Sequence, residues 1–185
     1  MKKIIALALS LMLLLGCVSA LADETAEKDT LTMLGAFSIK YDKLPEGFSF
    51  SVLKNTEMEY EAIISSTDNA KPIYLLTMAF SDQWDGVNTL ADVTDEELAA
   101  VKADFYRVTE LDLGDIEFSD GQTGLGTPLL FAKANDGSFG AVYTIYQSHE
   151  IEVDFFHSEE GVGVTEEDFD TIVKFLTDVE FVPAE

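Results

Sequence analysis

A group of four carboxylates gives this sequence its best candidate for a cation site. The group lies within nine residues, with Gly114 among them and Gly121 directly after, and it consists of Asp112, Asp115, Glu117 and Asp120. Ca²⁺ prefers a shell of oxygen ligands, so a carboxylate-rich loop with glycines suits it. The spacing differs from that of an EF-hand loop. In a chain with 35 acidic residues, a solvated acidic face is the plainer interpretation.

A second row of carboxylates, Glu150, Glu152 and Asp154, alternates with apolar residues. At a rise of ~3.3 Å per strand residue, all three share one face, with neighbours roughly 7 Å apart. Paired-carboxylate hydrolases use acids at such a separation, with one pKa raised by an apolar pocket. An exposed sheet face explains the same alternation, so a hydrolase is only the third hypothesis for function.

Other catalytic chemistry has little support. The two histidines, His149 and His157, bracket one predicted strand and would lie about 26 Å apart, too far to share a metal ion. The single cysteine, Cys17, lies in the apolar leader, and no serine sits in a G-x-S-x-G motif. The glycine-rich stretch 121–126 lacks the Lys-Ser/Thr end of a phosphate loop. We therefore expect no enzyme.

The only tryptophan, Trp84, is the candidate binding residue. It lies in the polar stretch 81–86, directly after an apolar strand. A tryptophan in this setting either plugs the edge of a sheet or forms an exposed contact for a partner. Both interpretations remain open from the sequence.

The first 22 residues predict export. Lys2 and Lys3 precede an apolar run over 4–15, which is too short to span a bilayer and has the form of a signal peptide. Small residues before Asp23 suit cleavage by ordinary signal peptidase, which implies secretion. The stretch 14–17 instead resembles the lipobox of bacterial lipoproteins, in which Cys17 would be lipidated and would tether the protein to a membrane surface.

The composition then limits the classes of partner that this protein is expected to bind. Removing residues 1–22 removes two of 11 basic residues and no acidic ones, which leaves a formal charge of −26. Such a surface repels phosphate backbones, so we expect no nucleic acid, and no membrane contact other than a lipid at Cys17. The expected partner is a protein or another component of the cell envelope. We expect no cofactor, with Ca²⁺ as the alternative.

Hydrophobic patterning predicts the elements that must position these residues. After a flexible lead-in over 23–34, one domain covers 35–185. Period-two alternation predicts strands at 37–41, 48–52, 58–64 and 150–155, and an apolar run predicts a buried strand at 73–80. Asn135-Asp136-Gly137 predicts a hairpin between two further strands. Capping-box patterns predict helices after Thr94 and Thr165. This mixture indicates the α+β class.

The element order resembles the PsbP-like fold. The resemblance rests on that order, on Phe37-Ser38-Ile39 followed by Leu44-Pro45-Glu46-Gly47, and on the closing helix 169–176. It implies an antiparallel β-sheet sandwiched by helices, an α/β/α sandwich, as in photosystem II extrinsic proteins, a nuclear Ran-binding import factor and small bacterial lipoproteins. The implied roles are non-enzymatic. The leading hypothesis is therefore an exported binding or accessory domain, and the alternative is a Ca²⁺-binding module.

Overall fold

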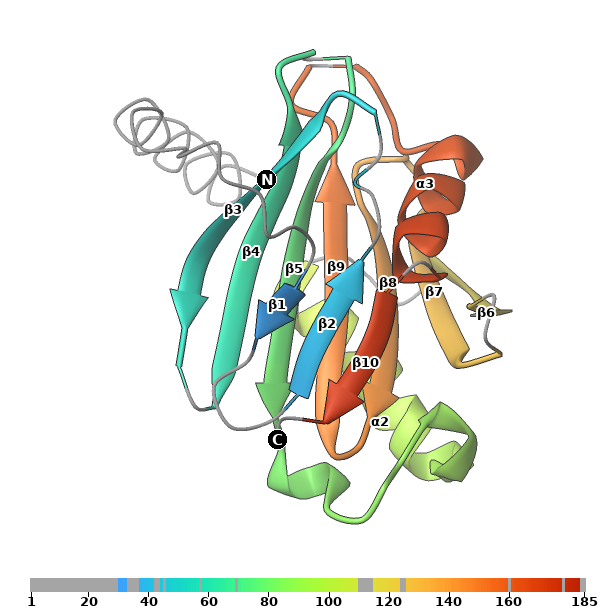
Figure 1. The fold of residues 1–185 in the computed structure, drawn as a ribbon. Coiled ribbons are helices and arrows are strands. Elements are labelled where there is room, and N and C mark those ends of the chain that lie inside the picture. The colour runs from blue at the N-terminus through green and yellow to red at the C-terminus, as the bar shows by residue number, and fades with distance from the viewer. Residues whose placement is uncertain are drawn as a thin grey trace.

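The structure is a computed structural model, drawn in Figure 1, and it describes the greater part of the chain beyond residue 29. The described residues are 30–32, 37–41, 44, 46–56, 58–68, 70–109, 115–123, 126–159, 161–177 and 179–183. The predicted signal peptide, Cys17 and Asp112 lie outside them.

A seven-stranded antiparallel sheet forms the centre of the molecule. Its spatial order is β3-β4-β5-β9-β8-β7-β6, so β9, which comes last in sequence among these seven strands, lies in the middle of the sheet. The strands are β3 (Phe48–Asn55), β4 (Glu59–Ser66), β5 (Ile73–Phe80), β6 (Ile116–Gln122), β7 (Pro128–Ala134), β8 (Gly140–Tyr146) and β9 (His149–Phe156). This confirms the predicted strands at these positions and the Asn-Asp-Gly hairpin, which joins β7 to β8.

A second, three-stranded sheet was not predicted. It has the order β1-β2-β10, with β1 (Thr30–Thr32), β2 (Phe37–Tyr41) and β10 (Val179–Pro183). The strand predicted at 37–41 is thus present, but it pairs with both ends of the described chain instead of joining the large sheet. In Figure 1, β2 and β10 are drawn in front of the large sheet, close to α3 (Glu166–Thr177).

Both predicted helices begin at the expected caps. In α2 (Asp95–Thr109), the backbone N–H of Thr94 donates to Glu97 at 2.9 Å, and the N–H of Glu97 donates back to the Thr94 hydroxyl at 3.3 Å. In α3, the N–H of Thr165 donates to Asp168 at 2.8 Å. Two short 3₁₀ helices, η1 (Asp82–Trp84) and η2 (Leu90–Asp92), precede α2. Within the described residues, no helix has the length and apolar character to span a membrane.

Strand alternation divides the core into two clusters. One contains Ile151, Val153 and Phe155 of β9 together with apolar residues of α3. The other contains Tyr143 and Ile145 of β8 together with apolar residues of α2 and the buried Trp84. The chain is therefore a mixed α+β domain, as predicted.

Candidate functional site

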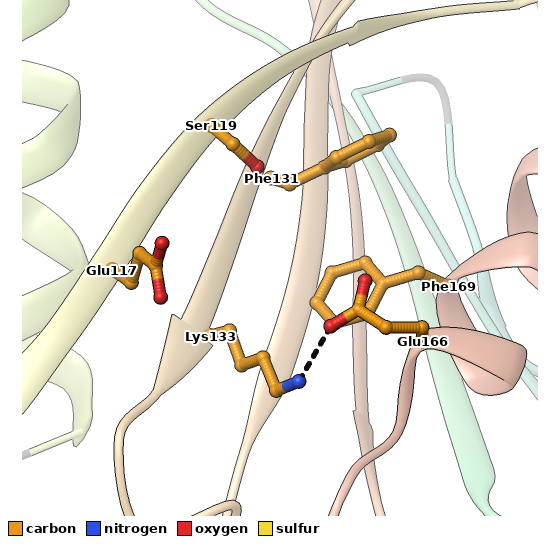
Figure 2. Close-up of a pocket in the computed structure, with 6 residues that line it drawn as sticks. All are labelled: Glu117, Ser119, Phe131, Lys133, Glu166 and Phe169. Atoms are coloured by element: carbon orange, nitrogen blue, oxygen red, sulfur yellow. Dashed lines mark hydrogen bonds and ion pairs between the residues drawn. The ribbon is translucent and has the colours of Figure 1, made fainter.

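A small open hollow lies where β6, β7 and the start of α3 meet. It has a volume of about 120 Å³, and its lining residues are Glu117, Ser119, Phe131, Lys133, Glu166 and Phe169 (Figure 2). The antiparallel pairing of β6 and β7 places Glu117 opposite Lys133 and Ser119 opposite Phe131, so all four side chains share one face. Glu166 and Phe169 complete the hollow from the first turn of α3.

Two phenylalanines form its apolar wall. The rings of Phe131 and Phe169 lie 5.5 Å apart at a tilt, and Phe169 packs edge-on against the buried Phe155 at 4.8 Å. A glycine makes room for the first ring, because a Cβ at Gly121 would lie 2.4 Å from the ring of Phe131. The wall is therefore anchored in the core below it.

Charged side chains of both signs surround this wall. The Lys133 ammonium donates to the Glu166 carboxylate at 2.7 Å, across the opening seen in Figure 2. Glu117 is exposed on the same face. The lining thus contains two carboxylates and one ammonium group, which gives it a net negative charge beside the aromatic rings. This arrangement suits a cationic group of a ligand, since ammonium groups interact favourably with both carboxylates and ring faces.

The predicted calcium group is divided by the sheet. Glu117 faces the hollow, whereas strand alternation places Asp120 on the opposite face with Ile116 and Phe118. Asp115 is exposed just before β6, and Asp112 lies outside the described residues. Among the described residues, no three acidic, histidine or cysteine side chains gather as a metal site would need.

Trp84 is fully buried, with 0 % of its surface exposed. Its indole N–H donates to the carboxylate of Glu150 at 2.6 Å, and the Tyr143 hydroxyl donates to the same oxygen at 3.2 Å. Burial and the Glu150 charge raise the pKa of Tyr143. In this structure the contacts of Trp84 hold η1 against the sheet. This position agrees with the plug interpretation, and no surface of the indole is exposed for contact with a partner.

The β9 carboxylate row is half-buried, which corrects the expected exposed face. Glu150 is held by Trp84 and Tyr143, as described above. Burial raises the pKa of Glu152 and raises that of Asp154 well above its ordinary value, with the two carboxyl groups hydrogen-bonded to each other. Burial and their mutual repulsion therefore favour the protonated form of this carboxyl pair. The segment that covers this face, η1 with α2, could not be placed there from the pattern of β9 alone.

The two histidines lie at opposite ends of β9, as predicted. His149 is buried, with its Nδ1 2.7 Å from the carbonyl oxygen of Gln147. His157 places Nε2 3.0 Å from the carboxylate of Asp168, which also accepts hydrogen bonds from the backbone N–H and the hydroxyl of Thr165 at the start of α3. His157 thus connects the end of β9 to the start of α3. This contact gives both His157 and Asp168 a structural role.

Most residues of the hollow were missed by the sequence analysis. Only Glu117 was among the candidate residues. Phe131 and Lys133 lie on β7 and Glu166 on α3, and local patterns do not encode how these elements pack together with β6. The one available signal was Lys133, a rare cation within an apolar strand of a very acidic chain. Comparison with protein-family models and with curated proteins found no match for this chain.

Proposed function

We propose that the chain is an exported, non-enzymatic binding domain, and that the hollow between β6, β7 and α3 receives a cationic group of its ligand. The single observation that carries this proposal is the combination of Glu117 and Glu166 with the Phe131–Phe169 wall in one hollow. The formal charge of −24 for the whole chain favours the same class of ligand, because it attracts cations from a distance.

The size of the hollow indicates a macromolecular partner. Pockets for free small molecules usually occupy roughly 300–1,000 Å³. A hollow of about 120 Å³ holds only a terminal group, such as a lysine side chain of a protein or an amine of an envelope component. The remaining affinity would then come from the surface around the hollow.

The rest of the proposal concerns setting and fold. Residues 1–22 direct export, followed by secretion or by lipidation at Cys17. The PsbP-like α/β/α sandwich is supported by the two core clusters, one sharing residues with α3 and the other with α2. The state of the β9 acids also favours binding over hydrolysis, because Glu150 is engaged by Trp84 and Tyr143.

A titration with a short lysine peptide tests the hollow. Acetyl-tetralysine amide should shift the NMR signals of the Phe131 and Phe169 rings in the mature domain. Glu166→Gln should weaken binding by up to about fivefold, since exposed ion pairs contribute about 0.2–1 kcal/mol. Glu117→Gln should act in the same direction.

Glu167→Gln provides the matched control. Glu167 is exposed in the same helical turn as Glu166 and carries the same charge, but it does not line the hollow. If both variants weaken the peptide equally, only the overall charge of the domain attracts it, and the hollow is not the site.

A further inference from the structure

Exposed apolar side chains gather at one edge of the large sheet. Among the described residues, Val52 is 52 % exposed, Leu53 41 % and Met58 56 %. Val52 and Leu53 belong to β3, and Met58 lies just before its neighbour β4. Only one other large apolar side chain of the described chain, Val162, is comparably exposed. The concentration at β3 therefore marks a particular place on the molecule.

The same strand forms one edge of the large sheet, and its pairing with β4 is interrupted by a β-bulge between Val52 and Lys54. In the described sheet β3 pairs with β4 alone, so its outer row of backbone N–H and C=O groups has no strand beside it (Figure 1). It is eight residues long and contains no acidic residue, in a chain that has 35. The opposite edge strand, β6, carries Glu117 and Asp120, the kind of charges that usually discourage pairing.

We propose that β3 pairs antiparallel with β3 of a second copy of this chain, which joins the two large sheets into one. A two-fold axis perpendicular to the sheet keeps each side chain on its own face, so residues of one face meet residues of that face. Phe48, Phe50 and Val52 share a face. The registers that place the exposed Val52 opposite Phe48, Phe50 or Val52 of the second copy therefore form a favourable apolar cross-strand pair.

The charges at the two ends of β3 fit this orientation. Glu46 is exposed just before the strand, and Lys54 is exposed near its end, where it also pairs with Glu59. Antiparallel pairing brings Lys54 of each copy to the end of the partner strand that carries Glu46. Two highly acidic molecules that pair along this edge therefore have opposite charges close together at both ends of the paired strands.

Sedimentation velocity of the mature domain at rising protein concentration tests the proposal. We expect a reversible monomer–dimer equilibrium. Val52→Glu should raise the dimer dissociation constant at least about tenfold, because it places carboxylates against apolar residues at two symmetric points. Val162→Glu adds the same charge at an exposed apolar residue away from β3 and should leave the dimer intact.

A charge reversal tests the orientation. Glu46→Lys should weaken the dimer although it lowers the net negative charge, whereas Glu96→Lys on α2, with the same change in net charge, should not weaken it. Adding Lys54→Glu to Glu46→Lys should restore dimerisation. Circular dichroism of each variant confirms that it is folded.

Two results would overturn the proposal. One is a wild-type domain that stays monomeric at every concentration, which includes the case in which another part of the chain covers β3. The other is a dimer that Val52→Glu and Glu46→Lys leave unchanged. Because β3 and the hollow lie at opposite edges of the sheet, neither result bears on the proposed ligand site.

Discussion

At the scale of single residues, the carboxyl pair of Glu152 and Asp154 is the most unusual feature of the described chain. The two acids lie on one face of β9, and the hydrogen bond between them requires a proton. Burial raises the pKa of Asp154 well above its ordinary value, and the neighbouring Glu152 raises it further. The proton is therefore bound more tightly in the folded state than in the unfolded chain.

This difference predicts how stability depends on pH. A group whose pKa is raised by folding stabilises the fold fully below its unfolded pKa, and this contribution is lost as pH rises through the folded pKa. The Asp154 contribution should therefore decline from about pH 4 upwards. Asp154→Asn, which can still donate to Glu152, should reduce the fall in melting temperature between about pH 4 and pH 8.

Thermal melts across this pH range, followed by circular dichroism, measure the effect. Asp85→Asn, at an exposed position after η1, is the matched control and should keep the slope of the wild-type protein. A variant at 154 with the wild-type slope would show that the pair holds no extra proton.

At the scale of elements, the hollow depends on the fit between β6 and β7. Gly121 leaves space for the ring of Phe131, which in turn packs against Phe169 of α3. The backbone of Gly121 is not in the left-handed region, so contact with the ring, and not conformation, excludes a side chain there.

Gly121→Ala should therefore lower the free energy of unfolding by about 1–3 kcal/mol, as overpacking usually does. It should also displace the Phe131 ring and weaken lysine-peptide binding. Gly163→Ala is the control, because a Cβ there meets its nearest atoms at 3.5 Å, an ordinary contact. Urea unfolding of both variants gives the comparison, and equal losses would argue against the proposed fit.

The sequence predicted those elements whose residues carry their own local signal. Alternation located β4 and β9, and the reciprocal Thr94–Glu97 bonds were predicted from four adjacent residues. Nothing local indicated that β9 would insert between β5 and β8, or that Trp84 would reach Glu150, 66 residues away. The hollow was missed for the same reason, because Lys133 and Glu166 meet only through tertiary packing.

At the scale of the whole molecule, the net negative charge is the dominant property. Without residues 1–22 the chain has a formal charge of −26, and self-repulsion of this size destabilises a compact state. Salt screens that repulsion over about 10 Å at 0.1 M ionic strength. The stability of the domain should therefore depend strongly on ionic conditions.

We predict that NaCl raises the melting temperature, and that CaCl₂ at matched ionic strength raises it by the same amount. Differential scanning fluorimetry of the mature domain compares the two salts directly. An extra gain in CaCl₂ that disappears in Asp115→Asn/Glu117→Gln would instead reveal specific calcium binding, since a ligand stabilises the state to which it binds.

The contact between Trp84 and Glu150 has an experimental use. The chain has a single tryptophan, so its fluorescence comes from one place, a dry site where the indole touches a carboxylate. Release of η1 from the sheet would expose this fluorophore to water and shift its emission to longer wavelength. The protein thus carries an intrinsic optical reporter of η1 docking, which can follow local opening separately from global unfolding.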